Sequence, residues 1–235
     1  MSQENRASAL SRALAQAEAC SPDLGEQLSA FARLARDIDP DTAAMVDRLA
    51  TRLASNGVGR GAPDVGEYMP DFLLPDPEGR LMSLGALTSS KASVIVFQRG
   101  HWCPFCGLTR RALSGVGDEI RRLGANLVII TPERHEFTKQ MQDARSEVVV
   151  LSDMDNAYAL SIGLAIWVGD EIRRAMEAAG RQLPLYNGNE SWTLPIPATF
   201  IVDRERKIRA RHLDLDYRRR MSPASILAVL ATIEG

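Results

Sequence analysis

The sequence has too few cysteines and histidines for a disulfide framework or for several metal centres. Its 235 residues include three cysteines and three histidines. Small secreted domains that depend on disulfides carry larger, even sets of cysteines. A structural zinc site needs four ligands, and the single Cys-x-x-Cys pair supplies only half of them. The scarcity of these residues favours a catalytic use of the cysteines over a structural one.

Strong net charge and long apolar runs are also missing. The formal net charge is −2, so no overall field draws nucleic acid or an anionic membrane to the chain, and we expect neither as a partner. No apolar run approaches the roughly 20 residues that span a bilayer, and the N-terminal residues hold no apolar signal core. We therefore expect a cytoplasmic protein. The basic cluster Arg218-Arg219-Arg220 is interpreted as solvated or locally paired.

The most informative stretch is a short apolar run that leads into two cysteines. Val94 to Phe97 is β-branched and aromatic and lies between polar neighbours, a pattern typical of a buried strand. Gly100 follows and can supply the backbone angles of a tight bend. The sequence thus predicts a strand that ends in a sharp turn just before the cysteines.

Cys103-Pro104-Phe105-Cys106 is predicted to begin a helix that runs to about Leu123. Pro104 suits the first helical position, where its missing N–H costs nothing, so Cys103 is predicted to be the N-cap. Cys106 then lies on the same face about one turn further on. The predicted strand, bend and helix bring two thiols to one helix N-terminus.

A thiol at a helix N-terminus has a lowered pKa, because the unpaired N–H groups and the helix dipole stabilise the reactive thiolate. A thiol three residues away can attack a mixed disulfide, or condense with a sulfenic acid to close a ring. The pair therefore predicts redox chemistry, with a zinc half-site or two structural thiols as alternatives. Cys20 lies far from the pair in sequence and is interpreted as a bystander.

Residues 1–56 are predicted to form three helices, separated at Ser21-Pro22 and Asp39-Pro40, where prolines break the helical periodicity. The helices carry apolar stripes that must be buried. We favour packing of these stripes on the chain's own core over a dimer interface, and we leave a homodimer open. A glycine-rich linker follows at residues 57–66.

The rest of the chain alternates strands and helices, which favours a parallel α/β sheet that an antiparallel strand completes. A small hairpin is predicted over residues 70–84. Further strands are predicted at 126–131, 148–151, 198–202 and 207–212, helices at 133–143, 156–163, 170–180 and after Ser222-Pro223, and a polar loop at 185–192.

Four sequence blocks stand out within this framework. They are Pro70-Asp71-Phe72 with Gly79-Arg80 and Ser83-Leu84, Arg99 to Cys106, Leu194 to Asp203, and Asp216-Tyr217-Arg218-Arg219. With these blocks, the region from about Gly66 to Glu234 resembles the thioredoxin-fold redoxins, and more closely the peroxiredoxin-like proteins grouped with alkyl hydroperoxide reductase and thiol-specific antioxidant. The helices predicted in residues 1–60 lie outside the resemblance.

The resemblance implies a thioredoxin-like α/β fold, a central mixed sheet flanked by helices. A helical extension would occupy residues 1–60 and the redoxin domain residues 61–235. The resemblance also implies an oxidoreductase, a thiol-dependent antioxidant peroxidase that reduces hydroperoxides through Cys103 and Cys106 without a cofactor or a metal. The pair would form a redox-active disulfide, and thioredoxin, glutaredoxin or a small thiol would then reduce it.

Two departures from the family pattern concern the groups that polarise a peroxide. Peroxiredoxins place a threonine or serine three residues, and a proline seven residues, before the attacking cysteine. Counting back from Cys103 or from Cys106 does not restore that motif. Peroxiredoxins also carry an arginine where this sequence has Pro197, as thioredoxins do. Our hypothesis is that Arg99 replaces that guanidinium from the other side, and the alternative is a surface arginine.

Other candidate site residues flank the cysteines or follow the resemblance. The resemblance makes Pro197 a candidate cis proline facing the cysteines, where it would leave a backbone edge free to pair with a substrate peptide, and it places Thr199 nearby. His101 is a candidate proton relay, since the unperturbed pKa of histidine is roughly 6.5, or else a solvent-exposed loop residue. Trp102 is expected to pack beside the pair.

Three functions stay open at this point. A thiol peroxidase ranks first, with a thiol–disulfide oxidoreductase acting on protein disulfides close behind. The third is a non-enzymatic redox sensor or interaction module, in which the pair switches the packing of the N-terminal helices. We expect Cys103 to be the exposed, attacking thiol and Cys106 the more buried one, because the N-cap feels the helix terminus most strongly. Spacing from Phe97 would instead favour Cys106 as the attacking thiol.

Overall fold

The computed structural model describes residues 3–89, 91–142 and 148–233. Residues 1–2 and 234–235, at the ends of the two predicted domains, lie outside the described residues, as does Asp143 at the end of the helix predicted over 133–143. None of the helices in these ranges is both long enough and apolar enough to cross a membrane.

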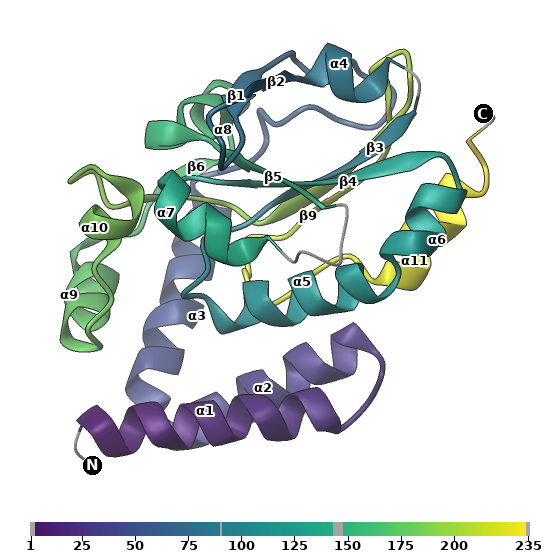
Figure 1. Ribbon diagram of the computed structural model, residues 1–235. Helices are drawn as coiled ribbons and strands as arrows, with labels where there is room; N and C mark the ends of the chain where they lie inside the picture. Colours follow the sequence, from purple (N-terminus) through teal and green to yellow (C-terminus); the bar gives the residue numbers. More distant parts are fainter. Residues whose placement is uncertain (1–2, 90, 143–147, 234–235) are drawn as a thin grey trace.

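A five-stranded mixed sheet forms the centre of the molecule (Figure 1). The strand order is β5-β4-β3-β8-β9; β3, β4 and β5 run parallel, whereas β8 pairs antiparallel with both β3 and β9. The strands are β3 (Ala92–Phe97), β4 (Ala125–Thr131), β5 (Val149–Ser152), β8 (Ala198–Val202) and β9 (Ile208–Leu213). This sheet confirms the predicted fold class.

β3 lies in the middle of the sheet and is buried along its whole length. Ile95 and Phe97 pack into one apolar core, and Val94 and Val96 pack into a second core on the opposite face. A strand that is buried on both faces has a continuous apolar sequence instead of an alternating one. This is why the strand before the cysteines can be recognised from its residues alone.

Helices cover one face of the sheet, and a hairpin with shorter helices covers the other (Figure 1). On the Val94 side lie α5 (Pro104–Gly115), α6 (Gly117–Arg122) and α11 (Pro223–Leu230). On the Phe97 side lie the predicted hairpin of β1 (Leu73–Pro75) and β2 (Leu81–Ser83), then α4 (Leu84–Thr88), and α8 (Ala157–Ser161), which follows the 3-10 helix η2 (Met154–Asn156).

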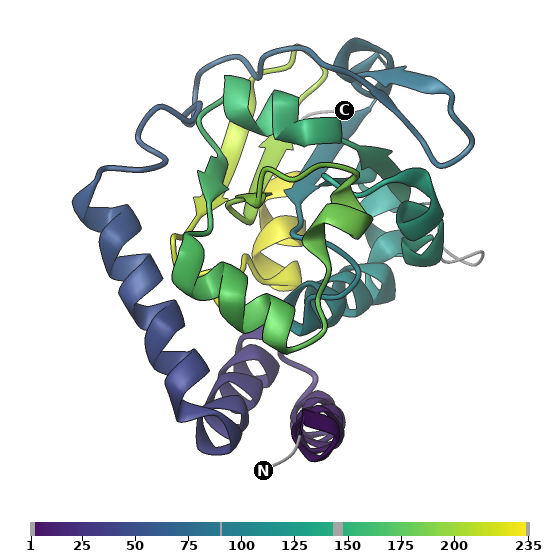
Figure 2. The same cartoon turned by 90° about the vertical axis from the view of Figure 1, so that its left-hand side faces the viewer.

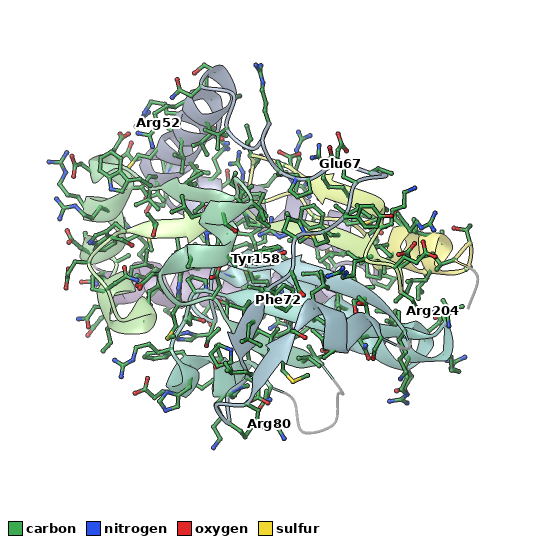
Figure 3. All side chains as sticks on the ribbon, turned by 90° about the horizontal axis from the view of Figure 1, so that it is seen from above. Arg52, Glu67, Phe72, Arg80, Tyr158 and Arg204 are labelled. Atoms are coloured by element: carbon green, nitrogen blue, oxygen red, sulfur yellow. The ribbon has the colours of Figure 1, made fainter. Side chains whose placement is uncertain are left out.

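The aromatic centre of this second core is visible from above. In Figure 3, Phe72 and Tyr158 lie together near the middle of the molecule, whereas Arg80 and Arg204 lie toward its rim. The rings of Phe72 and Tyr158 are 5.1 Å apart in an edge-to-face arrangement, a geometry that aromatic pairs prefer. This contact holds the hairpin region against α8, and the Tyr158 ring in turn stacks on Phe97 of β3.

The helix predicted to run to about Leu123 is interrupted. α5 ends at Gly115, Val116 leaves the helical region, and α6 begins at Gly117. Two glycines so close together weaken a helix, because glycine loses more backbone freedom on folding than any other residue. The prediction of one continuous helix was therefore wrong.

The segments around residues 133–195 also differ from the prediction. The polar loop predicted at 185–192 begins as a helix, α10 (Leu183–Asn187), with Pro184 in its first turn and Gly188 at φ +75° after its end. In place of one helix over 133–143, the structure has α7 (His135–Thr138) and the 3-10 helix η1 (Lys139–Met141). The helix predicted over 170–180 is α9 (Asp170–Ala178). The sequence did not predict a separate antiparallel pair, β6 (Ala165–Trp167) with β7 (Thr193–Pro195).

Three helices form the N-terminal extension, as predicted: α1 (Gln3–Ala19), α2 (Leu24–Ile38) and α3 (Pro40–Ser55). The side chains of Asp23 and Asp39 cap α2 and α3 by accepting backbone hydrogen bonds. The cap of the second helix is thus Asp23, which directly follows the predicted break at Ser21-Pro22. Figure 1 shows α1 and α2 in a layer beneath α5, with α3 rising from that layer toward the sheet, and Figure 2 shows α3 along the edge of the molecule.

The stripes of the first two helices pack on the molecule's own core, as the sequence analysis favours. Leu28 and Phe31 of α2 share an apolar cluster with Phe105 and Leu108 of α5. The rings of Phe31 and Phe105 are 5.0 Å apart. Burying one such side chain contributes about 1.5–3 kcal/mol. The extension therefore lies firmly against the start of α5, where the two cysteines are.

Candidate active site

A bend that requires glycine connects β3 to α5. Gly100 has φ +144°, and a Cβ at this position would lie 2.5 Å from Trp102 Nε1 and 2.7 Å from the Glu133 carboxyl group. The same carboxylate is fully buried and accepts a hydrogen bond from the His101 backbone N–H at 2.7 Å. These contacts confirm the predicted bend and fix the direction in which the chain enters α5.

The two cysteines lie at the start of α5, as predicted. Cys103 is the N-cap with Pro104 in the first turn, and the Cys103 carbonyl accepts a hydrogen bond from the Gly107 N–H at 3.0 Å. Both Cys103 and Cys106 are free thiols. Among the described residues, no group of three or more His, Cys, Asp or Glu side chains could hold a metal ion.

The expectation that Cys103 is exposed is wrong. Its exposed fraction is 1%, and that of Cys106 is 0%. Both sulfurs belong to the apolar cluster that Leu28 and Phe31 of α2 form with Phe105. The N-cap of an isolated helix would face solvent, but the N-terminal extension packs across this one.

The environment separates the pKa values of the two thiols. Burial, the largest influence, raises the pKa of Cys103, but a hydrogen bond from the Cys106 thiol and the positive charges of Arg99 and Arg220 together outweigh it. The net effect lowers the pKa of Cys103 to about 5. Burial and the neighbouring Cys103 raise the pKa of Cys106 well above its usual value. The surroundings therefore favour the thiolate at Cys103 and the protonated thiol at Cys106.

Arg99 is a buried residue, so the alternative of a surface arginine is wrong. Its exposed fraction is 7%, and its guanidinium carbon lies 3.9 Å from the centroid of the Tyr217 ring and 5.1 Å from that of Trp102. Aromatic faces stabilise a cation at such distances. Its backbone N–H also donates to the Cys106 sulfur at 3.4 Å. Arg99 thus brings a positive charge to the cysteine pair without a carboxylate partner among the described residues.

The sequence analysis did not include two residues that lie at the site, Arg220 and Tyr217. Arg220 places Nη2 at 3.9 Å from the Cys106 sulfur and donates to the Tyr217 carbonyl. Tyr217 belongs to one of the four sequence blocks on which the family resemblance rests, and that block could have indicated that this segment lies at the site. The interpretation of the basic cluster as locally paired is confirmed for Arg218, which binds Asp216 at 2.7 Å and Asp47 at 2.6 Å. Arg220 also binds groups close to it in the chain, the carbonyls of Tyr217 and Arg219, and in addition reaches the Cys106 sulfur.

His101 and Trp102 lie on either side of the bend. The His101 Nδ1 lies 2.6 Å from a Glu133 carboxylate oxygen, and its ring stacks on Phe137 at 5.1 Å. The interactions described for this ring include neither sulfur, so the proton-relay role stays a prediction. Trp102 packs against the apolar cluster that contains both cysteines, as expected.

Pro197 and Thr199 lie where β7 leads into β8. The described residues contain no cis peptide bond, so the expectation of a cis proline at Pro197 is wrong. The backbone edge that such a proline would leave free is already occupied, because β7 pairs with β6 and the Ile196 N–H donates to the Leu164 carbonyl at 2.7 Å. Thr199 is buried within the sheet, opposite Val96 of β3.

A small cavity of about 20 Å³ lies beside Arg99. Pro197 and Tyr217 line it together with Arg99, and apolar side chains of α3, β6 and β7 complete its walls. The site therefore combines two buried sulfurs, the buried guanidinium of Arg99, the half-buried Arg220 and a confined apolar space. Such a set of groups suits the reduction of a small electrophile by sulfur.

Comparison with known proteins places this geometry in context. Residues 65–211 match the model of the AhpC/TSA family. No curated protein matches the chain.

Several solved structures share the arrangement of the main chain. Peroxidoxin BcpB from Mycobacterium tuberculosis is 22% identical, with a TM-score of 0.53, and the alignment covers 73% of this chain and 99% of that one. Reduced Prx3 from Vibrio vulnificus in complex with hydrogen peroxide is 15% identical, with a TM-score of 0.57 over 72% and 99% of the chains. A mutant of peroxiredoxin 6 of Arenicola marina is 14% identical, with a TM-score of 0.56 over 72% of each chain. At such identities these likenesses show a common fold.

Proposed function

The chain belongs to the AhpC/TSA family, as the sequence resemblance indicates, and is an oxidoreductase of the thiol-dependent peroxidase class; we propose that Cys103 and Cys106 carry out its reaction. The observation that carries the proposal is that two buried sulfurs lie at the start of α5 with the positive charges of Arg99 and Arg220 beside them. This environment lowers the pKa of Cys103, and burial and Cys103 raise that of Cys106. A thiolate beside a protonated thiol suits attack on a peroxide followed by closure of a disulfide.

In the first step the Cys103 thiolate attacks the distal oxygen of a hydroperoxide, ROOH. The S–O bond forms as the O–O bond breaks, so Cys103 becomes a sulfenic acid and RO⁻ leaves and takes up a proton to give ROH. Sulfur loses two electrons and the peroxide gains them. Arg99 stabilises the negative charge that develops on the leaving oxygen, since a preorganised cation acts strongly in a buried site.

In the second step the Cys106 thiol attacks the sulfenic sulfur of Cys103. An S–S bond forms, the S–OH bond breaks, and the hydroxyl leaves as water with the proton of Cys106. The raised pKa of Cys106 keeps this proton in place until the sulfenic acid is present. The free thiols of the structure correspond to the reduced state that begins the cycle.

An external thiol completes the cycle by reducing the disulfide. Thioredoxin, glutaredoxin and small thiols all have the required chemistry. The burial of both sulfurs beneath α2 favours a small thiol, because a protein reductant needs α2 to move before it reaches the disulfide.

The alternative of a protein-disulfide oxidoreductase is less favoured, for a specific reason. Such an enzyme needs a free backbone edge and an exposed sulfur for its protein substrate. Here β6 occupies the edge of β7, and both sulfurs lie beneath the N-terminal extension. A non-enzymatic redox sensor is likewise less favoured, since the chain belongs to an enzyme family.

We also propose a reducing compartment, the cytoplasm, as the place of the reaction. The sequence holds only three cysteines, too few for the disulfide frameworks that are typical of oxidising compartments. The division into residues 1–60 and 61–235, and the formation of a homodimer, stay predictions. Limited proteolysis tests the first, and sedimentation equilibrium tests the second.

Stopped-flow tryptophan fluorescence of the reduced protein mixed with hydrogen peroxide tests the proposed function, because Trp102 packs beside the cysteine pair. We expect a rate constant far above that of free cysteine, and we expect Cys103→Ser to abolish it. Cys106→Ser should still react once and accumulate a sulfenic acid that dimedone traps.

Cys20→Ser provides the matched control and should behave as the wild type does, since Cys20 is exposed and lies outside the cluster of the pair. A wild-type rate equal to that of free cysteine would rule out the peroxidase. A rate lost only in Cys106→Ser would reverse the roles of the two cysteines.

A further inference from the structure

Part of the wall of the cavity beside Arg99 comes from outside the family domain. Leu49 and Leu53 of α3 line this cavity, whereas the family match begins at residue 65. Both leucines are buried and share an apolar cluster with Val168 and Leu194, which also line the cavity. The helical extension therefore shapes a space that also borders the redox site.

Arg99 connects this cavity with the reactive sulfur. Arg99 lines the cavity, its guanidinium carbon lies 3.9 Å from the ring centroid of Tyr217, which also lines it, and its positive charge acts on Cys103. Apart from Arg99 and Tyr217, the described side chains that line the cavity are apolar. A cation in the wall of an apolar space suits a ligand with one polar, reacting end and one apolar end.

We propose that this cavity receives the alkyl group of an organic hydroperoxide and that Leu49 and Leu53 limit the size of that group. The inference rests on the proposed function. When sulfur takes the distal oxygen, the alkyl group stays on the leaving oxygen, on the side away from the sulfur. Arg99 faces the leaving oxygen in that arrangement, so an alkyl group beyond it enters the cavity.

The volume of the cavity sets the size of the group that fits. It is about 20 Å³, little more than the roughly 10–15 Å³ that one water molecule needs. A very short alkyl group fits without rearrangement, and hydrogen peroxide places no group in the cavity. Cumene hydroperoxide, with its phenyl ring, requires α3 to move. The wild type should therefore react faster with ethyl hydroperoxide than with cumene hydroperoxide.

Substitutions at Leu53 test this inference in both directions. We measure second-order rate constants for oxidation of the reduced, full-length protein by hydrogen peroxide, ethyl hydroperoxide and cumene hydroperoxide. Leu53→Ala enlarges the cavity and should raise the ratio of the rate constant for cumene hydroperoxide to that for ethyl hydroperoxide by about tenfold. This is the smallest change in selectivity that one added or missing methylene group in a pocket usually causes. Leu53→Phe fills the cavity and should lower the ratio of the rate constant for ethyl hydroperoxide to that for hydrogen peroxide by a similar factor. Leu49→Ala gives a second enlargement if Leu53→Ala folds poorly.

Val46→Ala is the matched control. Val46 lies on the same helix and is buried in the same apolar cluster, but it does not line the cavity, so its ratios should equal those of the wild type. Identical ratios in the wild type and in the Leu49 and Leu53 variants would overturn the inference and leave the peroxidase intact. A wild type that reacts with none of the three peroxides would overturn the proposed function, and this inference with it.

Discussion

At the scale of single residues, the site depends on a few charges that act on one buried sulfur. A thiol buried in apolar surroundings normally stays protonated. At Cys103, the hydrogen bond from Cys106 and the guanidinium groups of Arg99 and Arg220 reverse that tendency. Since Arg99 has aromatic rings as neighbours and no described carboxylate partner, its charge is available to the sulfur and to the leaving oxygen.

The pH dependence of the first step follows from this arrangement. The reactive form of Cys103 is the deprotonated one and its pKa is lowered to about 5, so the rate with hydrogen peroxide should be constant near neutral pH. It should fall as the pH decreases through about 5. Arg220→Gln removes a positive charge beside the sulfurs, and the midpoint should rise by about 1 pH unit. Stopped-flow fluorescence as a function of pH measures both profiles.

Arg219→Gln is the control for this prediction. Arg219 is adjacent in sequence, but its side chain is exposed and lies 3.9 Å from Asp214, so the midpoint should not move. If Arg220→Gln titrates with the wild-type midpoint, the charge of Arg220 does not act on the thiolate.

At the scale of elements, two helices determine how the site is enclosed. α5 presents both sulfurs from its first turn, and α2 lies across that turn through the contact between Phe31 and Phe105. An N-cap thiol would otherwise face solvent. The packing of α2 therefore converts an accessible helix terminus into a closed site that small molecules enter more readily than proteins do.

Phe31→Ala tests the role of α2 as a cover. Removing this buried ring should lower the free energy of unfolding by about 3 kcal/mol, which urea denaturation measures. It should also raise the rate at which iodoacetamide alkylates Cys103, which mass spectrometry of the quenched protein measures. Both effects arise because α2 loses its main aromatic contact with α5.

Phe72→Ala separates these two effects. Phe72 is equally buried, but it lies in the core on the opposite side of the sheet and contacts Tyr158. It should cause a similar loss of stability with little change in alkylation. Equal alkylation rates in the two variants would mean that α2 does not control access to Cys103.

At the scale of the whole molecule, the site draws on three parts of the chain. The family region supplies the cysteines and Arg99, the N-terminal extension supplies the α2 cover and the α3 wall, and the C-terminal segment supplies Tyr217 and Arg220. In Figure 1 these parts meet around the start of α5. The extension is thus part of the closed site in this structure.

This enclosure predicts a preference among reductants. An opening of α2 that costs about 1.4 kcal/mol makes the fraction of molecules open to a protein reductant tenfold smaller. Phe31→Ala should therefore raise the rate constant for reduction of the Cys103–Cys106 disulfide by thioredoxin by up to about tenfold, and the rate constant for dithiothreitol much less. Stopped-flow measurement of disulfide reduction by each thiol checks this, and equal changes for the two reductants would contradict it.

The sequence by itself determined the local unit at the centre of the site. The continuous apolar run of β3, the bend at Gly100 and the helix start at Pro104 each depend on neighbouring residues, so they could be predicted. The order of strands and helices likewise indicated a mixed sheet, because its connections are local. The interruption at Val116 and the helix α10 were missed, although glycines and a proline marked both.

Only the tertiary structure decided which of these residues are enclosed and charged. Cys103 is buried because α2 packs over it, and Arg220 reaches the sulfurs because the C-terminal segment folds back across α5. The backbone edge beside Pro197 is closed because β6 pairs with β7. Each of these contacts joins segments that are far apart in the chain. The free energy of such contacts depends on the packing of the whole core, which a local pattern of residues does not contain.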